Sequence, residues 1–151
     1  MLPRFRHILV PLDFTAKNQA ALDIAFDFAV REQAVVSLLH VIETIHGPQD
    51  PEDPELRDFY GRLNHNAESE LDSKAQRFMA AGVRVNQRVR FGARPTEIVR
   101  YASEHAVDLI IMSSHAVDRA HPATSLATVS YQVSVLCDSP IMLVKSHPQR
   151  V

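Results

Sequence analysis

The chain has 151 residues, a length typical of one domain, and its composition of 46% hydrophobic and 23% charged residues is that of an ordinary globular protein. A net charge of −2 gives no basis for a nucleic-acid interface or an anionic-membrane interface. No apolar run approaches the ~18 residues that a membrane-spanning helix needs. The lone Cys137 excludes an internal disulfide, and Pro11 interrupts the short apolar stretch near the N-terminus, so we expect a cytoplasmic protein.

Two apolar runs near the N-terminus predict buried strands. They are residues 7–12 (HILVPL) and 34–42 (AVVSLLHVI), both rich in β-branched and aliphatic residues. Between them Thr15 is a plausible N-cap for a helix. The buried stripe of that helix recurs at helical spacing in Leu22, Ala25, Phe26 and Ala29.

A Pro- and Asp-rich segment, residues 46–54, predicts a flexible loop before a long helix. The helix is expected to begin near Glu55, and Gly82 lies where a glycine commonly ends a helix. One face of this helix is predicted to carry the apolar residues Leu56, Phe59, Leu63, Ala67, Leu71, Ala75 and Phe78.

Strands and helices continue to alternate in the second half. Residues 84–91 alternate polar and apolar, which predicts a strand near a sheet edge, and Pro95 suits the first turn of a helix. Residues 107–112 form an apolar strand, residues 141–144 (IMLV) form the last strand, and residues 146–151 are expected to fray. The last helix is predicted from the stripe Leu126, Val129, Val133 and Leu136.

This alternation predicts an α/β fold: one domain over residues 1–151, with a Rossmann-like, open, parallel, five-stranded sheet and helices on both faces. In such sheets the ligand crevice opens at the carboxyl ends of the strands, where the strand order reverses. The strand ends supply the candidate binding residues Pro11, Leu12, Asp13, Val41, Met112 and Ser113.

Several polar residues near these ends allow more than one interpretation. The carboxylate of Asp13 is either an acceptor for a ligand or a cap for the next helix, and the sequence leaves both open. Ser113 and His115 could suggest hydrolase chemistry with Asp13, but no G-x-S-x-G elbow is present, so no catalytic residue is assigned. The histidines lack metal-ligand spacing, and no metal is expected. Arg94 lies near a strand end, where it could reach an anion.

Taken in order, several segments of the chain resemble the universal stress protein family. HILVPLDFT is similar to its opening strand, commonly ILVPVDGS, and LLHVIE to its second strand. FGARPTEIVRYASEHAVDLIIMSSH is similar to its G-x-P-x-E-I-x-x-x-A...D-L-I-V-M-G-x-H-G block, and SLATVSYQVSVLCDSPIMLVK to its ending. The resemblance implies an adenine nucleotide alpha hydrolase-like fold and homodimers through the last strand, here residues 141–144. It also implies roles in stress tolerance and, in many members, ATP or AMP as a ligand.

The resemblance breaks at the phosphate loop. Nucleotide-binding members carry G-x-x-G, about nine residues, and then G-[S/T], whose main-chain amides hold the phosphates. The three glycine positions correspond here to Ser113, Ala116 and Ala127. The hydroxyl position is retained as Thr128, and Val129 follows it in the candidate site.

Physical chemistry indicates what the missing glycines cost. A non-glycine residue in a left-handed conformation costs ~1–2 kcal/mol, and Pro122 supplies no amide donor. Asp118 adds a like charge near an approaching phosphate. We therefore expect a dimeric binding or regulatory protein that has lost tight triphosphate binding and keeps the adenosine half of the crevice. The alternative is a genuine ATP- or AMP-binding member that contacts phosphate through Ser113, His115 and Thr128, and a slow ATPase is a third possibility.

Overall fold

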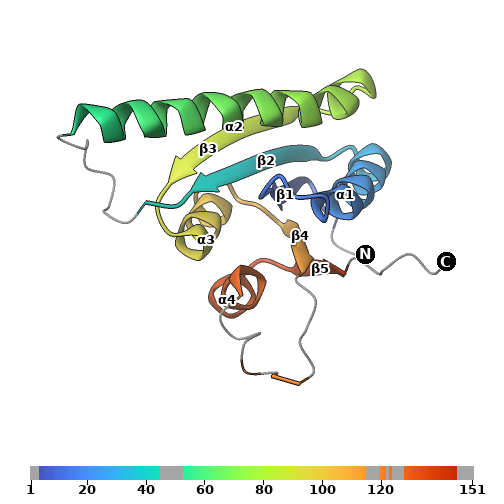
Figure 1. Ribbon diagram of the computed structural model, residues 1–151. Helices are drawn as coiled ribbons and strands as arrows, with labels where there is room; N and C mark the ends of the chain where they lie inside the picture. Colours follow the sequence, from blue (N-terminus) through green and yellow to red (C-terminus); the bar gives the residue numbers. More distant parts are fainter. Residues whose placement is uncertain (1–3, 45–52, 115–119, 122, 124–127, 146–151) are drawn as a thin grey trace.

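The computed structural model describes residues 4–44, 53–114, 120–121, 123 and 128–145. Within them, five strands form one parallel sheet in the order β3-β2-β1-β4-β5 (Figure 1), which confirms the predicted α/β fold class. The strands are β1 (His7–Pro11), β2 (Val35–Ile42), β3 (Val85–Phe91), β4 (Leu109–Ser114) and β5 (Ile141–Lys145). The helices are α1 (Asn18–Glu32), α2 (Pro54–Ala80), α3 (Arg94–Glu104) and α4 (Val129–Leu136).

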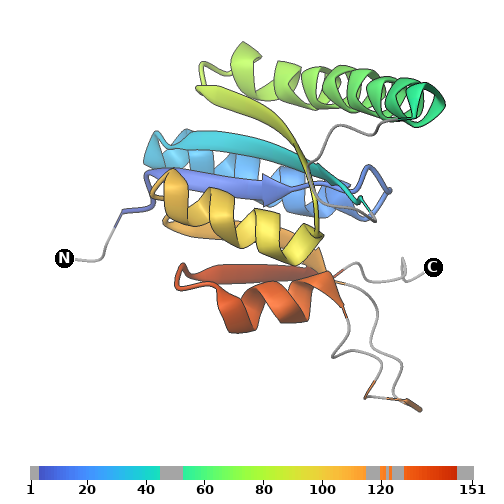
Figure 2. The ribbon, with the colours of Figure 1, turned by 90° about the vertical axis from the view of Figure 1, so that its left-hand side faces the viewer.

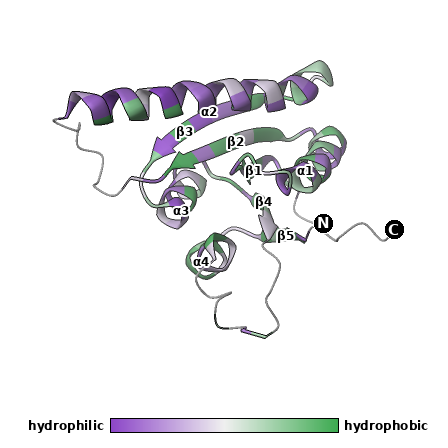
Figure 3. Cartoon of the chain, in the orientation of Figure 1, coloured by the Kyte–Doolittle hydropathy of each residue, from purple (hydrophilic) through white to green (hydrophobic). Residues whose placement is uncertain are grey.

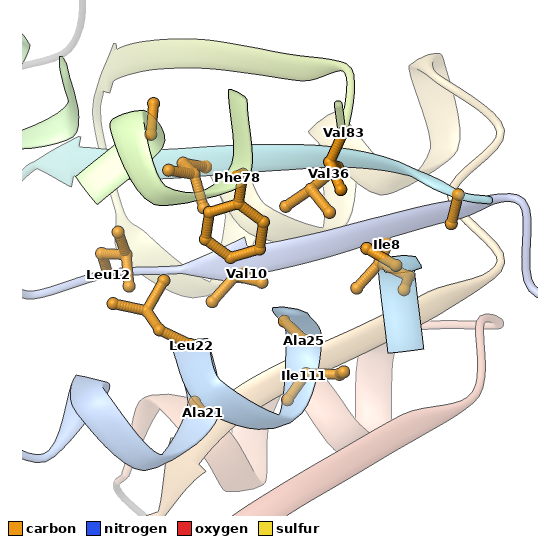
Figure 4. Packing of buried hydrophobic residues seen from close by; sticks show 14 of the residues in the cluster. Ile8, Val10, Leu12, Ala21, Leu22, Ala25, Val36, Phe78, Val83 and Ile111 are labelled. Atoms are coloured by element: carbon orange, nitrogen blue, oxygen red, sulfur yellow. The ribbon is translucent and has the colours of Figure 1, made fainter. Parts of the chain in front are cut away.

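Helices cover both faces of the sheet because side chains of a strand alternate between its faces. Helices α1 and α2 lie on one face and α3 and α4 on the other (Figures 1 and 2). Ile8 and Val10 of β1 pack with α1 and α2, whereas Leu9 packs with α3 and α4. All three side chains are fully buried, as expected of a central parallel strand. Figure 4 shows the first of these clusters, in which Phe78 of α2 and Ala25 of α1 face the strands.

The strand order reverses next to β1. β1 pairs with β2 on one side, with Pro11 opposite Leu39, and with β4 on the other, with Ile8 opposite Leu109. Chain order then runs outward in both directions, to the edge strands β3 and β5. The reversal therefore opens between the carboxyl ends of β1 and β4, where a ligand crevice is expected.

The first helix differs from the prediction at its start. Thr15 is not the N-cap: α1 begins at Asn18, and its cap residue Lys17 makes no side-chain capping bond. A turn precedes the helix, with the amide of Asn18 donating to the carbonyl of Thr15 at 3.1 Å. The hydroxyl of Thr15 donates instead to the carboxylate of Asp13 at 2.7 Å. The sequence therefore predicted the start of this helix about one turn too early.

Helix α2 begins close to its predicted start near Glu55. Asp53 caps the helix by accepting from the amide of Glu55 at 2.9 Å, and Pro54 is its first residue, one residue before the predicted start near Glu55. The remaining loop residues, 46–52, and the tail 146–151 lie outside the described residues.

The apolar face of α2 is buried only in part. Leu56 and Phe59 remain 37% and 46% exposed, and the buried positions of the helix begin at Ala67. Figure 1 shows why: the first turns of α2 project beyond the carboxyl ends of β2 and β3. The rest of the surface of α2 is mainly hydrophilic (Figure 3).

Two further boundaries were predicted imperfectly. The fourth strand runs two residues later than residues 107–112, because Val107 and Asp108 join α3 to β4. In α4, Val133 is buried as predicted, but Leu136 is 59% exposed, and Leu126 lies outside the described residues. Within the described residues, no helix is long and apolar enough to cross a membrane.

Candidate functional site

A narrow cavity of about 60 Å³ opens where the strand order reverses, between the ends of β1 and β4 and the first turns of α3 and α4. One water occupies about 10–15 Å³ by this kind of measure, so the cavity holds a few waters and not a whole nucleotide. A larger ligand would have to extend out of the enclosed part of the crevice or move its lining side chains apart. Seven of the predicted site residues line this crevice: Pro11, Leu12, Asp13, Val41, Met112, Ser113 and Val129.

The other four predicted residues do not join that lining. Thr128 lies beside it as the N-cap of α4, where its hydroxyl accepts from the amide of Tyr131 at 3.3 Å. His115, Ala116 and Ala127 lie outside the described residues.

Asn18 organises the entrance to the crevice, and the sequence analysis did not identify it. Its side chain is only 3% exposed, and its Oδ1 accepts from the amides of Asp13 at 3.0 Å and Phe14 at 2.8 Å. Its Nδ2 donates to the hydroxyl of Ser113 at 3.2 Å. One buried amide thus joins the loop after β1 to the end of β4.

Ser113 occupies the first glycine position of the resemblance, and its hydroxyl is part of the same network. It donates to the main-chain carbonyl of Lys17 at 3.0 Å while accepting from Asn18. A glycine could make neither bond. The side chain at this position therefore contributes to the local structure of the loop that precedes α1.

The carboxylate of Asp13 lines the crevice and also stabilises its own turn. Its Oδ1 accepts from the amide of Thr15 at 2.9 Å and from the hydroxyl of Thr15 at 2.7 Å. Of the two interpretations that the sequence left open, capping of α1 itself is not observed, because α1 starts at Asn18. Its position in the crevice lining keeps the ligand-acceptor interpretation available.

The crevice combines apolar walls with a few polar groups. Leu39 and Ile98 join Val41 and Met112 as apolar walls, and Ser130 adds a hydroxyl at the start of α4. Arg94 is the cation of the lining, as its position near a strand end indicated, and its Nε lies 3.7 Å from Oε1 of Glu43. This mixture of apolar walls and convergent polar groups is typical of small-molecule sites.

Three of the lining residues had a usable sequence signal. Leu39 lies in the predicted second strand, Ile98 three residues after Pro95 in the predicted third helix, and Ser130 two residues after the retained hydroxyl position, Thr128. Asn18 had none, because an isolated Asn in a helix start is not distinctive.

His40 lies under the loop that follows β1. Its Nδ1 is 2.7 Å from the carbonyl oxygen of Leu12, and because a carbonyl only accepts, Nδ1 carries the proton. Burial lowers the pKa of His40 below its usual value of 6.5, and the nearby charge of Arg94 lowers it further. The ring is therefore neutral at pH 7, with Nε2 as an acceptor.

A doubly wound parallel sheet with a crevice at the reversal of strand order defines a class of α/β proteins that bind small ligands at that edge. The sequence profile of the Universal stress protein family matches residues 4–145, so the chain belongs to that family.

Known members are similar over nearly their whole lengths. Universal stress protein MJ0577 of Methanocaldococcus jannaschii is 24% identical in sequence, over 93% of this chain and 95% of that protein. The solved structure of MJ0577 matches with a TM-score of 0.81 and 25% identity, covering 97% of this chain and 100% of the other.

Two other solved structures share the fold. Universal stress protein UspA from Lactobacillus plantarum matches with a TM-score of 0.79, 21% identity and coverage of 95% and 99%. A universal stress protein in complex with cAMP matches with a TM-score of 0.70, 18% identity and coverage of 95% and 98%.

Proposed function

We propose that this chain is a cytoplasmic stress-response protein that acts by ligand-dependent regulation and not by catalysis. Its crevice binds adenosine or AMP and has lost tight ATP binding. The observation that carries this proposal is the hydrogen bonding of the Ser113 hydroxyl. Its hydroxyl stands at the first glycine position and is engaged by Lys17 and Asn18, while the adenosine-side residues Pro11, Asp13 and Val41 line the adjacent crevice.

The physical expectation is weak binding. The enclosed cavity of about 60 Å³ is too small to bury an adenine, so the base would either stay partly exposed or have to move packed side chains, and both reduce affinity. Phosphates would additionally approach a segment that lacks the glycines with which nucleotide-binding members bring main-chain amides close to the phosphates, since the chain has no glycine after Gly92. ATP should therefore bind no better than adenosine.

A thermal-shift titration with ATP, AMP and adenosine tests the proposal. With a Kd of about 1 mM, 1 mM ligand stabilises the fold by only about 0.4 kcal/mol, whereas a Kd of about 1 μM gives about 4.1 kcal/mol. For a chain of this length these correspond to roughly 1–2 °C and roughly 8–16 °C. An ATP-specific shift above about 8 °C, or stoichiometric ATP released from the purified protein, would overturn the loss of ATP binding.

Two variants place the ligand. Asp13→Ala should abolish any adenosine-dependent shift, whereas Asp72→Ala, which removes an exposed carboxylate on α2, should leave it unchanged. Equal effects of the two variants would exclude the crevice as the adenosine site.

The second candidate is genuine binding of an adenine nucleotide. It is supported by the fold shared with the relative crystallised with cAMP and by the retained Thr128, whose hydroxyl lies at the start of α4. The same titration separates the two candidates, because only this one expects the phosphate to increase affinity.

We also propose a homodimer formed through β5. This strand is an edge of the sheet, Leu143 on it is 39% exposed, and apolar side chains of α4 next to it, Val135 and Leu136, are 64% and 59% exposed. An exposed edge strand is prone to aggregation, and isologous pairing of two copies would cover it. Light scattering that finds a monomer at micromolar concentration would refute the dimer.

Cell fractionation would test the cytoplasmic location.

A further inference from the structure

A second cavity, of about 340 Å³, lies beside the crevice, at the carboxyl end of β2. We call it the β2–α2 cavity, because the end of β2 and one face of α2 form most of its lining. The α2 residues are spaced i, i+3, i+4 and i+7, which places them on one side of the helix. They are Leu63, Asn66, Ala67 and Glu70.

Two aromatic residues that stack on each other border this cavity. Phe14 and His40 both line it, and their rings stack with centroids 4.2 Å apart and an interplanar angle of 23°. Phe14 adopts φ +64°, a left-handed conformation that costs a non-glycine residue ~1–2 kcal/mol. Strained backbone of this kind is concentrated at ligand sites.

His40, which lines the cavity, carries a hydrogen-bond acceptor on its ring. Its Nδ1 proton is used by the carbonyl of Leu12, which leaves the lone pair on Nε2. In the part of the chain that the structure describes, no side chain or main-chain group bonds Nε2. A ligand that binds here must therefore supply an N–H or O–H donor.

The charges of the cavity favour a cation. Glu43 and Arg94 both line it and form an ion pair at 3.7 Å, so they largely neutralise each other. Glu70 has no cationic partner among the described residues and leaves one net negative charge. Acceptors and negative charge thus exceed donors and positive charge on the cavity surface.

We propose that the β2–α2 cavity binds a small organic cation, whose N–H groups donate to Glu70 and to Nε2 of His40 and whose apolar part contacts the edge of the Phe14 ring. An amidinium or a protonated heteroaromatic amine has this chemistry. The site is separate from the crevice, although Val41 and Arg94 border both.

Benzamidine is the probe for this proposal, followed by amide NMR shifts of the ¹⁵N-labelled full chain. We expect saturable shifts at Phe14, at the end of β2 and along residues 63–70 of α2, with a Kd of about 1–10 mM, as befits a fragment of this size. Benzamide, neutral and of the same shape, and benzoate, an anion, should bind at least fivefold more weakly. Equal binding of all three compounds, or the absence of shifts at benzamidine concentrations up to about 20 mM, would overturn the proposal.

Matched variants test the named contacts. Glu70→Gln should weaken benzamidine at least fivefold, whereas Glu68→Gln, on the same helix and outside the cavity lining, should leave the Kd unchanged. Phe14→Gly should also weaken it at least fivefold, and because glycine adopts φ +64° readily, the main chain can keep its path. Loss of affinity in Glu68→Gln equal to that in Glu70→Gln would show a non-specific effect of charge and refute the assignment.

Discussion

Replacing Asn18 with alanine should destabilise the protein far more than an ordinary polar substitution. The amide side chain accepts from two main-chain donors and donates to Ser113, from a position that is only 3% exposed. Alanine would leave the amides of Asp13 and Phe14 without an acceptor.

The magnitude follows from those two donors. An unsatisfied buried donor costs about 1–3 kcal/mol, and since Asp13 and Phe14 are themselves only partly buried, the lower half of that range applies. The expected loss is therefore about 2–4 kcal/mol in the free energy of unfolding. At 2–4 °C per kcal/mol this lowers Tm by roughly 5–15 °C.

Urea and thermal denaturation followed by circular dichroism measure this loss. Asn64→Ala is the matched control, because among the described residues the side chain of Asn64 on α2 bonds the exposed side chain of Glu68 alone, at 3.3 Å. Its change should stay within about 0.5 kcal/mol. Hydrogen exchange should show faster exchange of the Asp13 and Phe14 amides in Asn18→Ala alone.

A double-mutant cycle tests whether Asn18 and Ser113 act together. Ser113→Ala alone should cost about 1 kcal/mol, and the double variant should lose less than the sum of the two single losses by about 0.5–1 kcal/mol. If Asn18→Ala were as stable as Asn64→Ala, or if the two losses were strictly additive, the described network would not organise the crevice entrance.

Three other predictions concern separate parts of the molecule. Burial, and to a smaller extent the charge of Arg94, lower the pKa of His40 below 6.5, so as the pH falls the unfolded chain binds a proton on this ring before the folded chain does. The free energy of unfolding should therefore decrease as the pH falls from 6.5 through the folded pKa. His40→Asn should flatten that part of a plot of stability against pH, and an unchanged plot would contradict the buried neutral ring. Leu143→Lys should convert the proposed dimer to a monomer in light scattering, while Met79→Lys, which alters a 49% exposed residue of α2, should not; dissociation by both would point to a general effect of charge. Gln33→Gly should raise stability by about 0.5–1 kcal/mol, because Gln33 ends α1 at φ +54°; a lower Tm for this variant would count against the left-handed conformation.

Part of the site could be predicted because its residues are tied to strand ends. Asp13, Val41 and Met112 were assigned from apolar runs alone, since parallel strands bring their carboxyl ends to one edge. The stacked pair of Phe14 and His40 could not be predicted in this way. It depends on a left-handed φ that no local pattern signals, and on two residues in different elements.

The sequence by itself determined the order of strands and helices, the fold class and the edge where a ligand crevice opens, because buried parallel strands need apolar runs and connecting helices need a 3.6-residue stripe. Only the tertiary structure decided which polar groups meet there. The bond between Asn18 and Ser113 joins residues 95 positions apart, and the exposure of Leu56 follows from the projection of α2 past the sheet. Local sequence patterns indicate which face of a helix or strand is apolar. Elements distant in the chain decide which partners a buried polar group finds and how much of an apolar face is buried.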